Sequence, residues 1–418
     1  MNHLRRLIAP LLAAFALATP AALSAAPRTD GTAGSVAPFA LPRGWQVERM
    51  VILMRHGVRS PDAAPPAIPG LPAPWPGWPD TRGLLTDHGA RAIALLAASD
   101  RLWLRRYGLV PANGCPAAGR VAILANSFER TIRTAQVYAA NVAPGCALAT
   151  VHKPLGQPDP LFPSAANRNL VVDPARADAA ARAAIGKGGL AAWDRRLQPL
   201  LARLNRILCG SSAADCGIRG GSTLEPATTS RPPRVHGSIE RAAKASSALL
   251  LQYANGWPAS RVGWGRATGA DITALTTLVN VPYQITVRPP YLSSLEIGTL
   301  KRRMALALSP SQPARLTVIV GHDGTIASLA GDLGLHWKIP GFAADFPSFG
   351  AGIGFATLRG PGGQSRVVAF FRGQSLEQIR GLARTPAYAQ VLPLRCVQPS
   401  GGDCQPAAFT RTLVGPPR

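Results

Sequence analysis

Three short apolar runs along the chain predict buried β-strands. These runs end at Met54, Leu124 and Val320, and each is short and continuous, as in a strand of a core sheet. Two further runs, 352–359 and 366–371, predict short strands near the end of the chain. If the first three strands lie in one parallel sheet, their carboxyl ends converge on one crevice, which is where such sheets bind ligands.

Apolar residues at helical spacing predict helices between these strands. One helix covers 84–108 and ends at a glycine, and another follows the second strand, with Glu129 and Arg130 in its first turn. We interpret Glu129 as a structural carboxylate, since acids favour that end of a helix. The stretch from 170 to 260 is rich in Ala, Leu and Arg with helical periodicity, which predicts an all-helical insertion.

Charged and imidazole side chains follow each of the first three strands. In chain order they are Arg55, His56, Arg59, Arg130, His322 and Asp323. Several arginines, two histidines and a carboxylic acid suit phosphoryl chemistry, because guanidinium groups pair with phosphate in a bidentate fork. Taken singly, each residue also has a structural interpretation: Arg59 as an ion-pair partner, for example, or His322 as a hydrogen-bonded core histidine.

The chain is strongly basic, with a formal net charge of +24 over 418 residues. Such a charge can indicate a nucleic acid or a membrane surface as partner. However, the arginines are scattered and no block of like charges forms a tail, so we interpret the excess as a composition bias and expect no nucleic-acid partner. What remains is long-range attraction for anionic substrates, which weakens with salt.

The first 26 residues predict a signal peptide. A basic start, MNHLRR, precedes an apolar stretch, LIAPLLAAFALA, and small residues at 22–26 offer a cleavage site. No later run approaches the roughly 20 apolar residues that span a bilayer. We therefore expect a periplasmic or secreted protein without a membrane span, whose expected state is a monomer.

The 6 cysteines fit export, since an even number in an exported chain usually forms disulfides. Many pairings are possible, so proximity is a weak guide. No Cys-x-x-Cys motif occurs, so nothing indicates a zinc ribbon, and we expect neither a metal nor a cofactor. The pairs that proximity suggests are Cys209 with Cys216 and Cys396 with Cys404, which leaves Cys115 for Cys146.

Residues 61–79 are rich in proline and contain Trp75 and Trp78, a composition typical of polyproline II and turns. Two interpretations stay open: a stiff surface loop, or a wall or lid of a site. A Gly-rich stretch at 350–355 leads into a strand rather than a helix, so we discount it as a phosphate loop. We interpret four further histidines as structural: His88, His152, His236 and His336.

Taken together, several motifs resemble the histidine acid phosphatases, the branch of the histidine phosphatase superfamily with Arg-His-Gly-x-Arg-x-Pro near its start and His-Asp near its end. This chain has RHGVRSP at 55–61 and HDG at 322–324. Similarity to the bacterial periplasmic phytase and glucose-1-phosphatase group covers nearly the whole mature chain. It continues through WPGWP, GLLTDHG, NSFERTIRTAQ, PDPLF, GWGR and CVQPSGGDCQPAAFT.

The resemblance implies an α/β fold with a mostly parallel central sheet flanked by helices, phosphoglycerate-mutase-like, and an inserted, smaller all-helical domain. The catalytic domain would be discontinuous, covering 45–165 and 285–418, with the helical domain at 166–284. The family's disulfides also support the three cysteine pairs suggested by proximity.

The resemblance further implies a role for each residue at the strand ends. It makes His56 a nucleophile that forms a phosphohistidine and Asp323 the general acid, and it implies an acid phosphatase. Neighbouring cations disfavour protonation of His56, while Asp323 donates a proton most easily when already protonated, so we expect an acid pH optimum. A metal is not required, because arginines take the place of a metal clamp. The residues that would hold the phosphoryl oxygens are Arg55, Arg59, Arg130 and His322.

Departures from the phytase group concern the substrate. Asp62 and Ala63 stand where phytases typically have Thr and Lys for additional phosphates, and a carboxylate there should repel a polyphosphorylated inositol. We therefore expect a broad or sugar-phosphate-preferring enzyme acting on small phosphate monoesters. Phytase activity is the alternative, since Arg288 could match a phytate-binding arginine and Lys244 could face the cleft. A glutamate that some members carry aligns loosely with Ser247.

Two other functions have less support. A non-catalytic binding protein of the same fold would need neither His56 nor Asp323. A phosphoglycerate-mutase-like transferase would belong to a branch that generally lacks the His-Asp dipeptide and the export signal.

Overall fold

The computed structural model describes residues 37–80, 82–162, 170–211, 215–396 and 404–415. The expected signal peptide, 1–26, lies outside the described residues, and so does the expected domain boundary at 165 and 166. No helix in the described part of the chain is long and apolar enough to cross a membrane.

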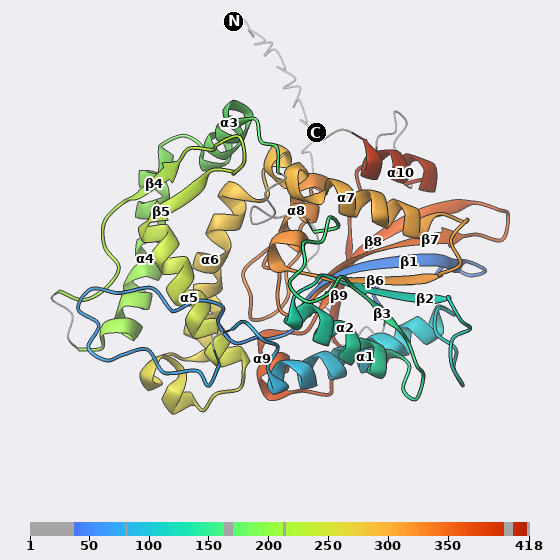
Figure 1. Ribbon diagram of the computed structural model, residues 1–418, viewed down its shortest axis with the longest axis horizontal. Helices are drawn as coiled ribbons and strands as arrows, with labels where there is room; N and C mark the ends of the chain where they lie inside the picture. Colours follow the sequence, from blue (N-terminus) through green and yellow to red (C-terminus); the bar gives the residue numbers. More distant parts are fainter. Residues whose placement is uncertain (1–36, 81, 163–169, 212–214, 397–403, 416–418) are drawn as a thin grey trace, which may run out of the picture. The chain divides into compact units, whose positions relative to one another are not determined.

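Seven described strands form one mixed sheet in the order β3-β2-β6-β1-β7-β8-β9 (Figure 1). The first four run parallel, with Met54 of β1 opposite Val320 of β6, and the last three are added antiparallel. The predicted α/β fold with a parallel core is confirmed. The strands are β1 (Gln46–Arg55), β2 (Val121–Ala125), β3 (Thr150–Val151), β6 (Leu316–Gly321), β7 (Gly352–Arg359), β8 (Ser365–Gly373) and β9 (Tyr388–Leu392).

Helices cover both faces of this sheet. Alternate residues of β1 point to opposite faces: Ile52 packs in one apolar cluster with side chains of α1 and α2, and Leu53 packs in another with side chains of α7 and α8. Strand β1 is therefore apolar at successive positions, as expected of a strand buried on both faces. The helices are α1 (Asp87–Arg106), α2 (Glu129–Val142), α7 (Pro290–Leu308), α8 (Asp323–Leu333), α9 (Leu376–Gly381) and α10 (Pro406–Val414).

The segment between the two parts of the sheet is mainly helical, but the all-helical prediction was wrong. Two short strands, β4 (Ser222–Glu225) and β5 (Arg234–Gly237), pair antiparallel within it. Ion pairs from Glu225 to Arg231 and to His236, each at 2.6 Å, help to hold this hairpin together. Its helices are α3 (Pro174–Ile185), α4 (Gly189–Cys209), α5 (Ser238–Ala254) and α6 (Gly269–Thr286), with a 3-10 segment at Ala259–Gly265.

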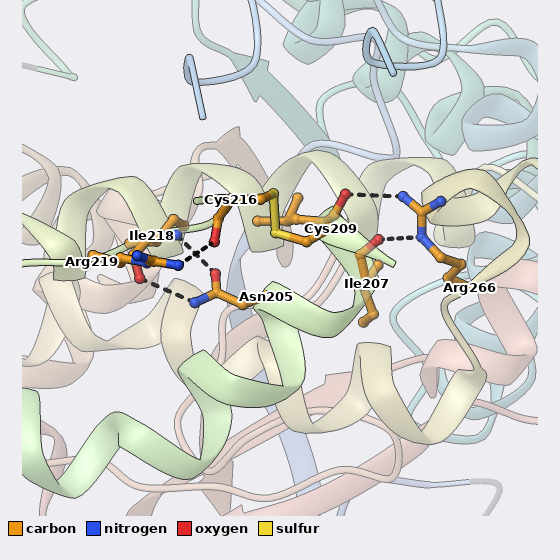
Figure 2. Close-up of a disulfide and its surroundings, with 8 residues drawn as sticks. Asn205, Ile207, Cys209, Cys216, Ile218, Arg219 and Arg266 are labelled. Carbon is orange, nitrogen blue, oxygen red and sulfur yellow. Dashed lines mark hydrogen bonds between the residues drawn. A yellow bond between two sulfur atoms is a disulfide. The ribbon is translucent and has the colours of Figure 1, made fainter. Parts of the chain in front are cut away.

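All three expected cysteine pairs form disulfides: Cys115 with Cys146, Cys209 with Cys216, and Cys396 with Cys404. Figure 2 shows the second of these pairs at the end of α4. There Arg266 donates hydrogen bonds to the carbonyls of Ile207 and Leu208, at 2.6 and 3.0 Å, which satisfies backbone groups that the end of a helix leaves unpaired.

The proline-rich segment 61–79 packs against the helical region through its tryptophans. The ring of Trp75 lies 5.1 Å from that of Trp264, and the ring of Trp78 lies 4.7 Å from that of Trp257. The segment is docked on the helical region, and Asp62, near its start, lines the candidate site described below.

A buried ion pair links the helices to the sheet, and it gives a testable prediction. Arg372 and Asp100, 1% and 0% exposed, lie 2.9 Å apart, and the Tyr138 hydroxyl donates to the same carboxylate at 2.8 Å. Asp100→Ala would leave a buried charge uncompensated, so we expect it to lower the free energy of unfolding by about 3–5 kcal/mol in urea denaturation. The exposed pair of Asp87 with Arg133 supplies the control, since Asp87→Ala should cost no more than about 1 kcal/mol. Equal losses of unfolding free energy in Asp100→Ala and Asp87→Ala would contradict the importance of the buried ion pair.

Candidate active site

The carboxyl ends of β1, β2 and β6 meet at one cavity of about 320 Å³. This is the crevice that the three apolar runs predicted. The cavity is lined by His56, Arg59, Asn126, Arg130, His322 and Asp323, together with Asp62, Asp159 and Glu296. Arg55 lies beside it and contacts Asp323. The structure therefore brings together all six of the residues that the sequence singled out at strand ends.

The His56 ring is buried and held in one orientation. Its Nδ1 lies 2.8 Å from the carbonyl oxygen of Gly57, so Nδ1 carries the proton and Nε2 carries the lone pair. Burial, followed by the charges of Arg55, His322, Arg130 and Arg59, lowers the pKa of His56 well below its ordinary value. The imidazole therefore stays neutral, and nucleophilic at Nε2, in mild acid.

Gly57, next to His56, is packed closely against helix α1. A Cβ atom at this position would lie 2.8 Å from Ile93 and 2.9 Å from Leu85, so helix α1 and the segment before it leave no room for a side chain. The Gly57 amide donates to the Thr134 hydroxyl of α2 at 3.1 Å. The glycine of the RHG motif thus has a packing role in this fold.

Two of the arginines have buried guanidinium nitrogens without a hydrogen-bond partner among the described residues: Nε of Arg55 and Nε of Arg130. Arg130 stacks over the Phe128 ring, 4.6 Å from its centroid, while Arg59 pairs with Asp62 at 3.2 Å. A buried donor without a partner is costly. An oxyanion bound in the cavity would supply the missing acceptors.

The second histidine sits at the start of α8. Its Nε2 lies 3.0 Å from Oδ1 of Asn126, so this nitrogen carries a proton. Burial, the charge of Arg130 and those of the other site arginines lower the pKa of His322 to about 4, against the opposing charge of Asp323. His322 is therefore a neutral hydrogen-bond donor above that pH.

Asp323 is the first residue of α8 and pairs with Arg55 at 2.8 Å. Burial alone would raise the pKa of Asp323, but the charges of Arg55 and then of Arg59 lower it well below the ordinary value. In this arrangement the carboxyl group is ionised. The hydroxyl of Tyr283 lies near this carboxylate, and burial and the charge of Asp323 raise the pKa of Tyr283.

The residues expected to contact the substrate are not all at the cavity. Asp62 lines it. Lys244 instead pairs with Glu240 on the exposed face of α5, at 2.7 Å, and Arg288 pairs with Asp345 at 3.4 Å and donates to the Leu335 carbonyl. Neither side chain lines the cavity, because each is directed to a carboxylate elsewhere.

Sequence reasoning missed Asn126, Tyr283 and Glu296. Asn126 is the first residue of the NSFERT motif, and the motif by itself did not identify Asn126 as a residue of the site. Glu296 lies between Ser293 and Leu300 on the buried face of α7, so a polar residue at a core position of that helix was the available signal. Nothing in the spacing around Tyr283 distinguishes it from a core residue.

The remaining sequence predictions around the site concern structural groups. Glu129 begins α2 and accepts a hydrogen bond from the Leu85 amide at 2.8 Å, which agrees with a structural carboxylate. His88, His236 and His336 have partners outside the cavity: the Ile379 carbonyl, Glu225 with Glu240, and Asp345. In the described part of the chain, no three His, Cys, Asp or Glu side chains are grouped so that they could hold a metal ion.

Comparisons with known proteins agree with this geometry. No family model matches the sequence. The chain is 29% identical to phytase AppA of Escherichia coli over 398 residues, which is 88% of this chain and 91% of the relative. It is 28% identical to glucose-1-phosphatase of Salmonella typhimurium over 298 residues, 69% of this chain and 71% of the relative. The structure of Hafnia alvei phytase in complex with tartrate matches with a TM-score of 0.80, at 27% identity, covering 89% of this chain and 97% of that one.

Proposed function

We propose that the chain is a histidine acid phosphatase, like the bacterial phytases and glucose-1-phosphatases that it resembles, and that it hydrolyses phosphate monoesters through a phosphohistidine on His56. One observation carries the proposal. The neutral imidazole of His56, with its lone pair on Nε2, lines the same cavity as Arg59 and Arg130, and the buried Nε atoms of Arg130 and of the adjacent Arg55 lack hydrogen-bond partners among the described residues.

In the first step, Nε2 of His56 attacks phosphorus. The N–P bond forms as the ester P–O bond breaks, and the leaving oxygen takes a proton from Asp323. Arg55, Arg59 and Arg130 stabilise charge on the transferring oxygens, and the Nε2–H of His322 donates to one of these oxygens in place of its bond to Asn126. Catalysis by fixed cations needs no reorganisation at the moment of reaction.

In the second step, water attacks the phosphohistidine. Asp323, now ionised, accepts a proton from that water, the N–P bond breaks, and inorganic phosphate leaves with His56 neutral again. Atoms and charge balance over the two steps without a metal, so we expect a chelator to leave the activity unchanged.

The state of Asp323 sets the direction of the pH dependence. Its pKa is lowered while Arg55 is its partner, so it cannot act as an acid until substrate binds. A phosphate group beside it adds negative charge and competes for Arg55, and both effects raise the pKa of Asp323. Protonated Asp323 is required for the first step, so the rate falls as pH rises above that shifted pKa. An acid optimum follows.

We propose a broad or sugar-phosphate-preferring range of substrates, with phytate hydrolysis as the second candidate. The phytase alternative is favoured by the longer match, since phytase AppA aligns with 88% of this chain and the Salmonella glucose-1-phosphatase with 69%. The main proposal is favoured by the carboxylate of Asp62 at the cavity and by the position of Lys244 and Arg288 away from it.

We also propose that the protein acts in the periplasm or outside the cell. Three disulfides, one of them between the buried cysteines Cys209 and Cys216, are typical of an oxidising compartment. Expression with and without residues 1–26, followed by fractionation, tests this location.

The function is tested by phosphate release from p-nitrophenyl phosphate, glucose 1-phosphate and phytate between pH 3 and 8, with and without a chelator. We expect release that is highest in acid, insensitive to chelation and faster with glucose 1-phosphate than with phytate. Faster release from phytate would favour the second candidate. A folded protein that releases phosphate from none of the three would contradict the proposed activity.

A further inference from the structure

One carboxyl group in the cavity has no part in the reaction described above. Glu296 extends from α7 into the cavity that contains His56 and Asp323. The hydroxyl of Ser328 on α8 lies near it, and among the described residues no ion pair joins Glu296 to a cation. A carboxyl group withdrawn from water without a counter-ion reduces stability. Such a group in a ligand cleft is a candidate for contact with the substrate.

The charges around the cavity divide into two groups. The cations gather at the strand ends, where the phosphoryl group binds. Beyond them the ionisable lining residues are the carboxyl groups of Asp62, Asp159 and Glu296, and the described lining contains no lysine. Asp62 and Asp159 already have partners, Arg59 and the Leu161 amide, at 3.2 and 3.0 Å. The carboxyl of Glu296 is therefore the one best placed to bind a new group.

The protonation of Glu296 decides what it can bind. Burial raises the pKa of Glu296 to about 7, against a smaller effect of the Ser328 hydroxyl. In mild acid, where we expect the enzyme to work, Glu296 is thus a neutral carboxylic acid with one donor and spare acceptor capacity. That combination matches an alcohol hydroxyl, which also donates and accepts. A neutral carboxylic acid has no positive charge with which to bind a second phosphate dianion.

We propose that Glu296 is a specificity-determining residue that hydrogen-bonds a hydroxyl of the leaving group. The substrates it favours are monophosphates of polyhydroxylated alcohols or sugars, and those it disfavours carry a second phosphate next to the reacting one. This inference rests on the proposed phosphatase function and adds to it a residue that selects among leaving groups.

Glu296→Ala, Glu296→Gln and Glu296→Lys test the inference on three substrates. For Glu296→Ala we expect kcat/KM for glucose 1-phosphate to fall about tenfold, the effect of one lost hydrogen bond to a buried partner. For p-nitrophenyl phosphate, whose leaving group has no alcohol hydroxyl, we expect a change of less than about twofold. Glu296→Gln should keep most of the activity on glucose 1-phosphate, and Glu296→Lys should raise the ratio of phytate to glucose 1-phosphate by about tenfold.

Glu48→Gln is the matched control, since it removes one negative charge at the start of β1, where Glu48 pairs with Arg359. It should leave kcat/KM unchanged for all three substrates. If Glu296→Ala lowers kcat/KM equally for every substrate, or for none of them, the inference is overturned.

A binding measurement separates failure of this inference from failure of the proposed function. His56→Ala keeps the cavity but not the nucleophile, so calorimetry on it with glucose 1-phosphate and with inorganic phosphate needs no turnover. Adding Glu296→Ala should weaken glucose 1-phosphate binding about tenfold and leave phosphate binding unchanged. If the wild-type protein fails to hydrolyse p-nitrophenyl phosphate, the proposed function is wrong whatever this binding comparison shows. Equal weakening of both ligands would overturn the role of Glu296.

Discussion

Replacing His56 by alanine is expected to lower kcat/KM for p-nitrophenyl phosphate by at least about 1,000-fold. The side chain supplies the atom to which phosphorus is transferred, and direct attack by water would have to use a site with no base placed for it in the first step. Binding should be much less affected, because Arg55, Arg59 and Arg130 remain. Steady-state kinetics and phosphate calorimetry on the same preparation measure the two effects.

The matched control for this variant is His152→Ala. His152 is exposed. In the described part of the chain, its Nδ1 lies 2.8 Å from the carbonyl oxygen of Lys153, the residue next to it. Its removal should change neither rate nor affinity. Retention of more than a tenth of the activity by a folded His56→Ala protein would contradict the role of His56 as nucleophile.

Asp323→Asn is expected to have different effects on the two steps of the reaction. The amide cannot protonate the leaving oxygen, so phosphate release from glucose 1-phosphate should fall by about 100- to 10,000-fold, the range for loss of a general acid. p-Nitrophenolate leaves without a proton, so the first step with p-nitrophenyl phosphate should stay comparatively fast. The second step loses its base, and the phosphohistidine should therefore accumulate.

Stopped-flow measurement of p-nitrophenol checks this expectation, since Asp323→Asn should give a burst followed by slow turnover. Asp87→Asn, on the exposed surface, is the control and should behave as wild type. An equal loss on both substrates without a burst would contradict the general-acid role. Because the asparagine also leaves Arg55 without its counter-ion, a parallel measurement of unfolding is needed to show that the variant is folded.

Much of this site could be predicted because it lies where short apolar runs end. The runs before Arg55, Arg130 and His322 identify strands, and parallel strands must place their carboxyl ends together. The antiparallel direction of β7, β8 and β9 could not be predicted in the same way, since buried strands are apolar in either direction. The hairpin of β4 and β5 has four residues in each strand, which is too short for a reliable pattern.

The substrate side of the site was harder to predict because it depends on where long side chains point. Arg288 and Glu296 lie eight positions apart, and the arginine was the natural expectation for a phosphate site. In the structure Arg288 is paired with Asp345, and Glu296 lines the cavity. The ionisation of Asp323 likewise depends on a contact with Arg55 at the end of the neighbouring strand β1, which lies far away in the sequence, so no local pattern contains it.

The most direct test of the central claim is to look for the phosphohistidine itself. Wild-type protein and Asp323→Asn would be mixed with p-nitrophenyl phosphate, quenched within the burst under denaturing alkaline conditions, digested and analysed by mass spectrometry. The account predicts one phosphate on the peptide that contains His56, more of it in Asp323→Asn than in wild type, and none in His56→Ala. A full burst of p-nitrophenol with no phosphorylated peptide, or with phosphate on another residue, would contradict it.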